Sequence, residues 1–129
     1  MPAMPWKSLA QADADRDYLV MASALPLLRF AKTLRFFRFV QAIRRQLAST
    51  QGLVGYSLSA KPFAKRYWTL SVWEDEEALT AFMRKPPHVD AMTALRPHMG
   101  PTRFVRWSVK GSDTPLAWDI ALRRLEAGS

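Results

Sequence analysis

The 129-residue sequence predicts one α+β domain with a ferredoxin-like βαββαβ order and an extra C-terminal helix. Two strand-like runs joined by a short turn at Lys61-Pro62 form the centre of the pattern. A strand-like run and an amphipathic segment precede them, and a helical segment and a fourth strand-like run follow. We therefore expect an N-terminal arm over residues 1–16, the ferredoxin-like domain over residues 17–110, and a C-terminal helix over residues 111–129 packed on the same domain.

Composition limits the kinds of site that the chain can carry. It has no cysteine, which excludes disulfides, thiolate nucleophiles and cysteine-ligated metals. The formal net charge is +8, but the basic residues are scattered from Lys7 to Arg124, a pattern more typical of solvated helix faces than of a binding stripe. No apolar run is long enough for a membrane span, and residues 1–16 lack a signal-peptide core, so we expect a cytoplasmic protein.

The first strand and the first helix have distinct patterns. Residues 17–25 are nearly all apolar or small, as in a strand covered on both faces, and Pro26 ends the run. Thr33 is a suitable N-cap for a helix over residues 34–50, and Gly52 suits its C-terminal cap. The helix presents an apolar stripe opposite its arginines, formed by Phe36, Phe39, Val40, Ile43 and Leu47.

The two central strands are predicted over residues 53–61 and 65–74, and their short connection makes them antiparallel. Alternation in the second of them places Trp68, Leu70 and Val72 on one face. We expect the helices to cover that face, and Val54, Tyr56 and Leu58 of the first strand to share it. The opposite face would expose Tyr18, Tyr67, Trp73 and Phe104, a patch that predicts a homodimer through the sheet face.

The second half of the chain follows the same logic. Asp75 is expected to cap a helix that ends at Lys85-Pro86-Pro87, and a shorter helix resumes over residues 88–96. The fourth strand is predicted over residues 102–110. Thr114 and Pro115 then form the start of the C-terminal helix, which runs to about Glu126.

The segment Tyr67-Trp68-Thr69-Leu70-Ser71-Val72-Trp73-Glu74-Asp75, with Ala78, Leu79 and Phe82 after it, resembles a strand-to-helix signature of the dimeric α+β-barrel superfamily. This superfamily includes antibiotic-biosynthesis and heme-degrading monooxygenases. The segments Phe36-Phe37-Arg38 and 52–58 are similar to an uncharacterised branch near the spheroidene-monooxygenase-like proteins. The resemblance implies a dimer with a small-molecule pocket between each sheet and its helices.

A monooxygenase-like protein that works as a cofactor-free oxygenase would need an apolar pocket with a few polar groups for a hydrophobic or aromatic molecule. The candidates for the pocket walls are Phe36, Trp68, Phe82, Met92 and Trp107. The candidates for a cationic or proton-transferring group are His88, Arg38 and Arg106. No metal site and no cofactor are predicted, and whether the chain turns over a substrate is left open.

Three alternatives remain. Heme-degrading members carry a tryptophan and a histidine where this chain has Phe82 and Met92, so heme binding would need His88 as a shifted ligand. RNA-recognition motifs share the topology, but their glycine and phenylalanine positions are absent here, which disfavours nucleic acid as a partner. The third alternative is a non-catalytic ligand-binding or scaffold dimer.

Overall fold

The computed structural model describes residues 6–26, 33–61, 66–85, 88–100, 102–114 and 117–127. Its centre is an antiparallel five-stranded sheet with the order β1-β3-β4-β2-β5. The strands are β1 (Lys7–Ser8), β2 (Asp17–Pro26), β3 (Leu53–Lys61), β4 (Arg66–Trp73) and β5 (Arg103–Lys110). The helices are α1 (Thr33–Ala48), α2 (Glu76–Arg84), α3 (His88–Leu95) and α4 (Trp118–Ala127), with short 3-10 turns at Arg96–His98 and Gly111–Asp113.

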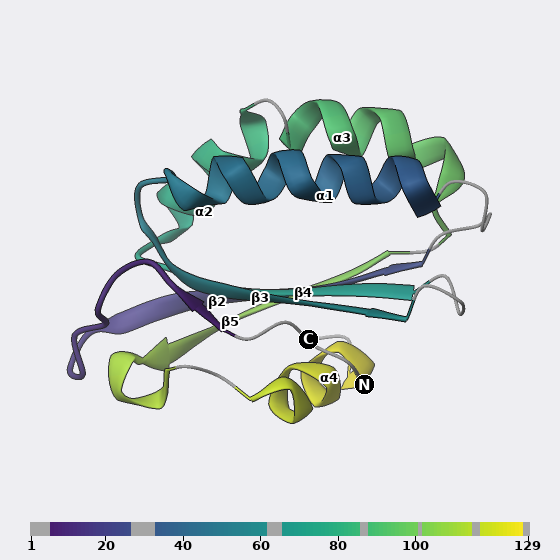
Figure 1. The fold of residues 1–129 in the computed structure, drawn as a ribbon. Coiled ribbons are helices and arrows are strands. Elements are labelled where there is room, and N and C mark those ends of the chain that lie inside the picture. The colour runs from purple at the N-terminus through teal and green to yellow at the C-terminus, as the bar shows by residue number, and fades with distance from the viewer. Residues whose placement is uncertain are drawn as a thin grey trace.

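The four long strands lie in the spatial order β3-β4-β2-β5, and the predicted ferredoxin-like α+β fold is confirmed. Helices α1, α2 and α3 cover one face of the sheet, and α4 lies against the other face (Figure 1). Among the described helices, none is long and apolar enough to cross a membrane.

Two local features set the connection between α1, the sheet and α2. Gly52 follows α1 with a φ of 83°, the left-handed conformation that favours glycine. A Cβ atom at Gly52 would lie 2.4 Å from the Cβ of Ala78 in α2, so the close approach also requires glycine. Asp75 caps α2 as predicted, because its side chain accepts a hydrogen bond from the backbone N–H of Ala78 at 2.8 Å.

The prediction of which sheet face the three helices cover is wrong. Trp73 packs with Leu79 and Phe82 of α2, so its face is the one beneath α1–α3. Leu70 and Val72 lie on the opposite face, in a cluster with residues of α4. Alternation along a strand separates the two faces correctly, but both faces carry large apolar side chains here because each is covered by helix.

A β-bulge in β3 breaks the expected alternation of that strand. Leu53 pairs with Trp73 and Gly55 pairs with Val72, so Val54 is the extra residue. Val54 therefore joins the cluster on the α4 face, whereas Tyr56 joins the cluster around Trp73. Val54 thus lies on the face of Leu70 and Val72, as expected, whereas the expectation is wrong for Tyr56 and Leu58, which lie on the face of Trp73.

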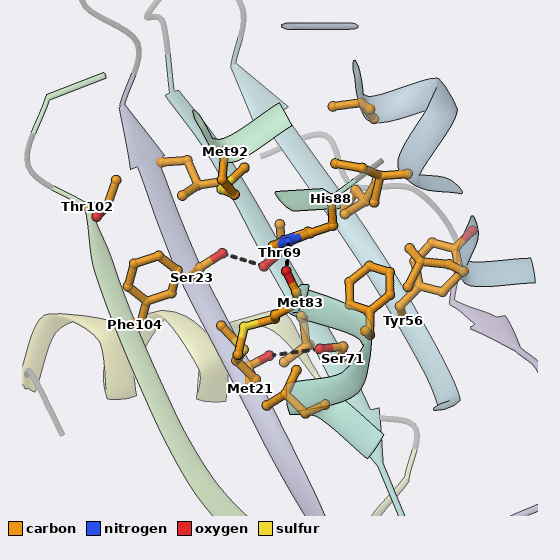
Figure 2. A pocket seen from close by; sticks show the side chains of 18 of the residues that line it. Met21, Ser23, Tyr56, Thr69, Ser71, Met83, His88, Met92, Thr102 and Phe104 are labelled. Atoms are coloured by element: carbon orange, nitrogen blue, oxygen red, sulfur yellow. Dashed lines mark hydrogen bonds between the residues drawn. The ribbon is translucent and has the colours of Figure 1, made fainter. Parts of the chain in front are cut away.

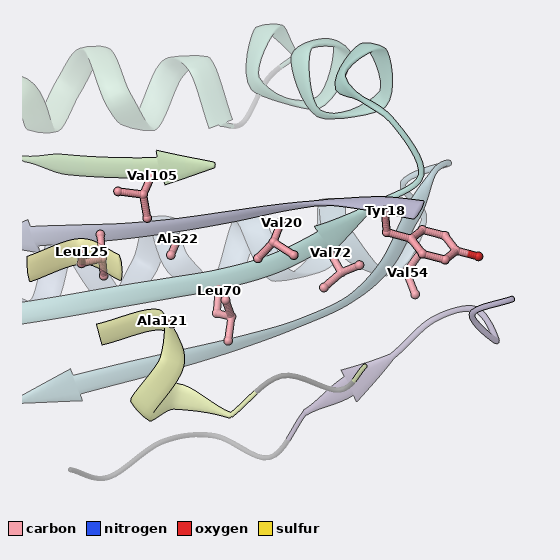
Figure 3. Packing of buried hydrophobic residues seen from close by; sticks show 9 residues of the cluster. All are labelled: Tyr18, Val20, Ala22, Val54, Leu70, Val72, Val105, Ala121 and Leu125. Atoms are coloured by element: carbon pink, nitrogen blue, oxygen red, sulfur yellow. The ribbon is translucent and has the colours of Figure 1, made fainter. Parts of the chain in front are cut away.

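The C-terminal helix forms a second core with the sheet (Figure 3). Ala121 and Leu125 are buried against side chains of β2, β4 and β5, among them Val20 and Leu70. Near the start of α4, the Trp118 Nε1 donates a hydrogen bond to Ser57 Oγ at 3.0 Å.

The N-terminal segment is more ordered than an irregular arm. Lys7 and Ser8 pair with Tyr56 and Gly55 at the edge of β3. The ring of Trp6 lies so close to Gly55 that a Cβ atom there would be 2.5 Å from the Trp6 Nε1. Residues 1–5 of the predicted arm lie outside the described residues.

The aromatic patch that predicted a dimer is not exposed in the chain. Tyr18, Tyr67 and Trp73 are only 4%, 4% and 1% exposed, whereas Phe104 is 52% exposed. The first three rings are covered within one chain, so they do not supply the exposed surface on which that prediction depended.

Candidate functional site

A cavity of about 590 Å³ lies between the sheet and helices α1–α3. This volume is within the range that small-molecule sites usually have. The sheet supplies its floor, and the three helices supply its walls (Figure 2). Most of the lining is apolar, from residues such as Met21, Phe39, Ile43, Leu58, Phe82 and Met92.

Hydroxyl groups interrupt the apolar floor on two neighbouring strands. Ser23 of β2 lies opposite Thr69 of β4, and their hydroxyls are hydrogen-bonded to each other. Ser71, two residues further along β4, accepts a hydrogen bond from the Trp73 Nε1 at 2.8 Å. Figure 2 shows this row of hydroxyls along the floor, so a bound molecule would meet oxygen donors or acceptors there.

His88, the first residue of α3, lines the cavity from the helix side. Its Nδ1 lies 3.3 Å from the carbonyl oxygen of Met83. A carbonyl oxygen can only accept, so in the neutral ring Nδ1 carries the hydrogen and Nε2 keeps a free lone pair. Burial lowers the pKa of His88 below its ordinary value of 6.5, and the hydrogen bond to the Met83 carbonyl opposes part of that shift. Near neutral pH the ring is therefore uncharged and able to accept a proton.

The position of His88 is fixed from two sides. Its ring packs on Phe82 with ring centroids 5.0 Å apart, and Phe82 in turn packs on Trp73 at 5.3 Å. Gln46 of α1 accepts a hydrogen bond from the His88 backbone N–H at 3.3 Å and donates one to the Phe82 carbonyl at 3.4 Å. One amide side chain thus holds the end of α2 and the start of α3 together.

The opening of the cavity is marked by the lining residues that are exposed. Among the described lining residues, only Arg96, Thr102 and Phe104 are exposed, and all others are buried or half-buried. Arg96 follows α3, Thr102 immediately precedes β5, and Phe104 is the second residue of β5. Solvent therefore reaches the cavity between the end of α3 and the first residues of β5.

The structure brings together three of the predicted site residues, Phe82, His88 and Met92, on the cavity wall. Trp68 and Trp107 are not part of that lining, because they pack on the opposite face of the sheet against the cluster that includes α4. The Arg124 guanidinium lies over the Trp107 ring, 4.9 Å from its centroid. The side chain of Phe36 lies outside the described part of the structure.

Neither predicted arginine lines the cavity. Arg38 is exposed on α1, and Arg106 is paired with Glu76 at 2.7 Å near the start of α2. Among the described lining residues the arginine is Arg96, which sequence reasoning missed because it appeared only as the last residue of a short helix. Gln46 was missed as well, since nothing in one sequence links it to His88. Within the described ranges, no group of three His, Asp or Glu side chains is arranged to hold a metal ion.

Comparison with known proteins shows which family the central segment resembles. Residues 35–94, from α1 to the end of α3, match the family model described as antibiotic biosynthesis monooxygenase. This segment is similar to the antibiotic biosynthesis monooxygenase family. The resemblance seen in the sequence is confirmed at this level, whereas the spheroidene-monooxygenase-like branch stays a prediction. No curated protein matches the chain.

Solved structures share the fold of this monooxygenase-like domain at low sequence identity. An antibiotic biosynthesis monooxygenase candidate from Nitrosomonas europaea is 12% identical with a TM-score of 0.63, over 80% of this chain and 96% of that one. SnoaB, a cofactor-independent oxygenase from Streptomyces nogalater, is 18% identical with a TM-score of 0.55, over 73% of this chain and 94% of that one.

A candidate monooxygenase from Lactobacillus acidophilus is 11% identical with a TM-score of 0.62, over 79% of this chain. The match spans only 50% of that longer protein. At these identities the likeness extends to the fold alone.

Proposed function

We propose that the protein is a cofactor-free oxygenase of aromatic or enolic molecules, with His88 as the general base. The observation that carries this proposal is the state of the His88 ring. It lines an apolar cavity, its Nδ1 is engaged by the Met83 carbonyl, and its Nε2 is free to accept a proton. SnoaB, which shares the fold, is a cofactor-independent oxygenase, and this is compatible with the proposal.

The chemistry that such a site can perform begins with a proton transfer. A neutral imidazole in a cavity removes a proton from an activated C–H or O–H group of the substrate. The resulting anion is electron-rich enough to reduce O₂ directly. For an activated methylene the balanced reaction is R₂CH₂ + O₂ → R₂C=O + H₂O, in which the substrate supplies all the electrons.

The floor of the cavity has groups suited to the charge that develops. The hydrogen-bonded hydroxyl pair of Ser23 and Thr69 keeps one O–H that can donate to an enolate oxygen, and a donor held in advance stabilises such a charge most in a water-poor site. The walls of Phe82 and Met92 limit water around the anion. The proton accepted by His88 is then available for the oxygen atom of O₂ that leaves as water.

Oxygen uptake with dithranol, an anthrone with an activated methylene, tests the proposal. The wild-type protein is expected to accelerate quinone formation, and His88→Gln to lower the rate by a factor of about 100 or more. Arg84→Gln, at an exposed position on α2 outside the cavity, is the control and should keep the wild-type rate. Equal rates for wild type and His88→Gln would remove His88 as the base.

Heme binding is a second candidate function, favoured by the same ring. Histidines that bind iron commonly donate their other nitrogen to a backbone carbonyl, as His88 does to Met83. His88, with Phe82 and Met92 nearby, would be the residue that holds the group, and heme would supply one-electron and O₂ chemistry. A Soret shift at stoichiometric hemin that disappears in His88→Gln would favour this function over the cofactor-free one.

Two further expectations from the sequence stand as proposals. The protein is proposed to act as a homodimer, and to work in the cytoplasm. If dithranol binds without being oxidised, the non-catalytic ligand-binding or scaffold alternative is supported instead. The RNA alternative gains nothing from the sheet, because Tyr67 is buried on the face beneath α1–α3 and Trp68 packs on the face that α4 covers.

A further inference from the structure

The charged side chains in the described lining of the cavity have one sign, which is positive. None of its described lining residues is aspartate or glutamate, and the one arginine among them, Arg96, is one of the three exposed residues at the opening. Deeper in the cavity the polar groups are the uncharged hydroxyls and His88. A ligand with an anionic group would therefore meet a cation at the opening and no carboxylate along the lining.

The spacing of the two basic residues also limits the ligand. His88 is the first residue of α3 and Arg96 follows the last, eight positions later. At 1.5 Å per residue their backbone positions are separated by about 12 Å along the helix. Apolar side chains such as Ile43, Met92 and Met99 line the cavity around this span.

From these observations we infer that the cavity takes an apolar molecule with one anionic oxygen group, a carboxylate or sulfonate, which Arg96 binds at the opening. The apolar body then extends inward toward His88. A guanidinium matches the two oxygens of such a group with its paired N–H donors, so Arg96 determines ligand orientation. This inference rests on the proposed function only for the location of the site, since it concerns binding and not turnover.

Two fluorescent dyes that differ by one charged group test the inference. Anilinonaphthalene sulfonate carries the anion, and N-phenyl-naphthylamine has the same apolar body without it. The wild-type protein is expected to bind the sulfonate dye about fivefold more tightly than the neutral dye, with an advantage that shrinks as salt is raised. Arg96→Gln should remove that advantage and leave the affinity for the neutral dye unchanged.

Two control variants locate the effect. Arg84→Gln removes an equal charge from the exposed end of α2 and should leave the preference for the sulfonate dye intact. Met92→Trp fills the cavity and should weaken both dyes, with circular dichroism used to check folding. The inference is overturned if Arg96→Gln keeps the preference, or if Arg84→Gln abolishes it equally.

The test separates this inference from the proposed function. Loss of oxygen uptake in His88→Gln together with an unchanged dye preference in Arg96→Gln would sink the inference alone. An Arg96-dependent preference in a protein that never oxidises dithranol would sink only the oxygenase proposal.

Discussion

The side chain of Gln46 and the backbone of His88 are hydrogen-bonded across 42 residues of sequence, at 3.3 Å. The same amide donates to the carbonyl of Phe82, so α1 holds the junction between α2 and α3 in place. The ring of His88 owes its depth in the cavity to this junction, because the residue stands at the first position of α3. Gln46 is therefore a positioning residue for the proposed base.

We expect Gln46→Ala to loosen this junction and to admit water around His88. Burial is the main cause of the lowered pKa of His88, so its pKa should rise toward 6.5. NMR titration of the His88 ring measures the change, and Gln41→Ala, at an exposed position on α1, is the control. An unchanged His88 titration in Gln46→Ala would contradict the positioning role.

His88 also makes stability depend on pH. Its pKa is lower in the folded chain than the ordinary value of 6.5, so the unfolded chain binds the proton more readily. The free energy of unfolding should therefore fall as pH drops through 6.5 toward the lowered pKa, by at most about 1.4 kcal/mol per pH unit. Above 6.5 this contribution is fully present.

Urea unfolding between about pH 7.5 and about pH 5.5 measures the effect. In His88→Asn the decrease should be smaller than in the wild type, because the group with the lowered pKa is gone. His98→Asn, which removes the other histidine of the chain, is the comparison. Parallel pH profiles for wild type and His88→Asn would show that the decrease arises elsewhere.

Gly52 is expected to tolerate no side chain. Its φ of 83° disfavours an L-residue, and an added Cβ would lie 2.4 Å from that of Ala78. Gly52→Ala should lower the free energy of unfolding by about 1–3 kcal/mol. Gln51→Ala, at the exposed neighbouring position, should change it by less than about 0.5 kcal/mol. Similar urea midpoints for the two variants would argue against the strained position.

The order of helices and strands could be predicted from the sequence, since periodicity, the Asp75 cap and Gly52 are local signals. The sequence did not predict which face of the sheet helices α1–α3 cover. Both faces of β4 carry large apolar side chains, and only the position of α4 shows why Trp68 lies outside the cavity while Trp73 lies next to it. The bulge at Val54 likewise depends on the pairing with β4, which no pattern within β3 reveals.

The candidate site divides in the same way. Phe82, His88 and Met92 were predicted because one helical segment and its neighbour carry them. Arg96 and Gln46 could be assigned to the site only from the tertiary structure. Gln46 contacts His88, which is distant in sequence, and Arg96 lies beyond the end of the helix that His88 begins. The arginines predicted from the sequence, Arg38 and Arg106, lie on the exposed surface away from the cavity. A positive charge in the sequence does not show whether an arginine lies at a cavity opening or elsewhere on the surface.

The homodimer through the sheet face remains a prediction, and α4 affects how it can form. Ala121 is completely buried between α4 and the sheet, above a face that includes Val20 and Leu70. Two sheets can pack directly on this face only when α4 leaves it. Ala121→Arg places a long charged side chain in the buried contact and should displace the helix.

The displaced helix would expose an apolar face that favours self-association. We therefore expect a larger dimer fraction for Ala121→Arg than for the wild type, measured by size exclusion with light scattering. Ala127→Arg adds the same charge at the exposed end of α4 and should behave as the wild type does. If a folded Ala121→Arg chain keeps the wild-type mass distribution, the face beneath α4 is not a dimer interface, and any dimer must use another surface.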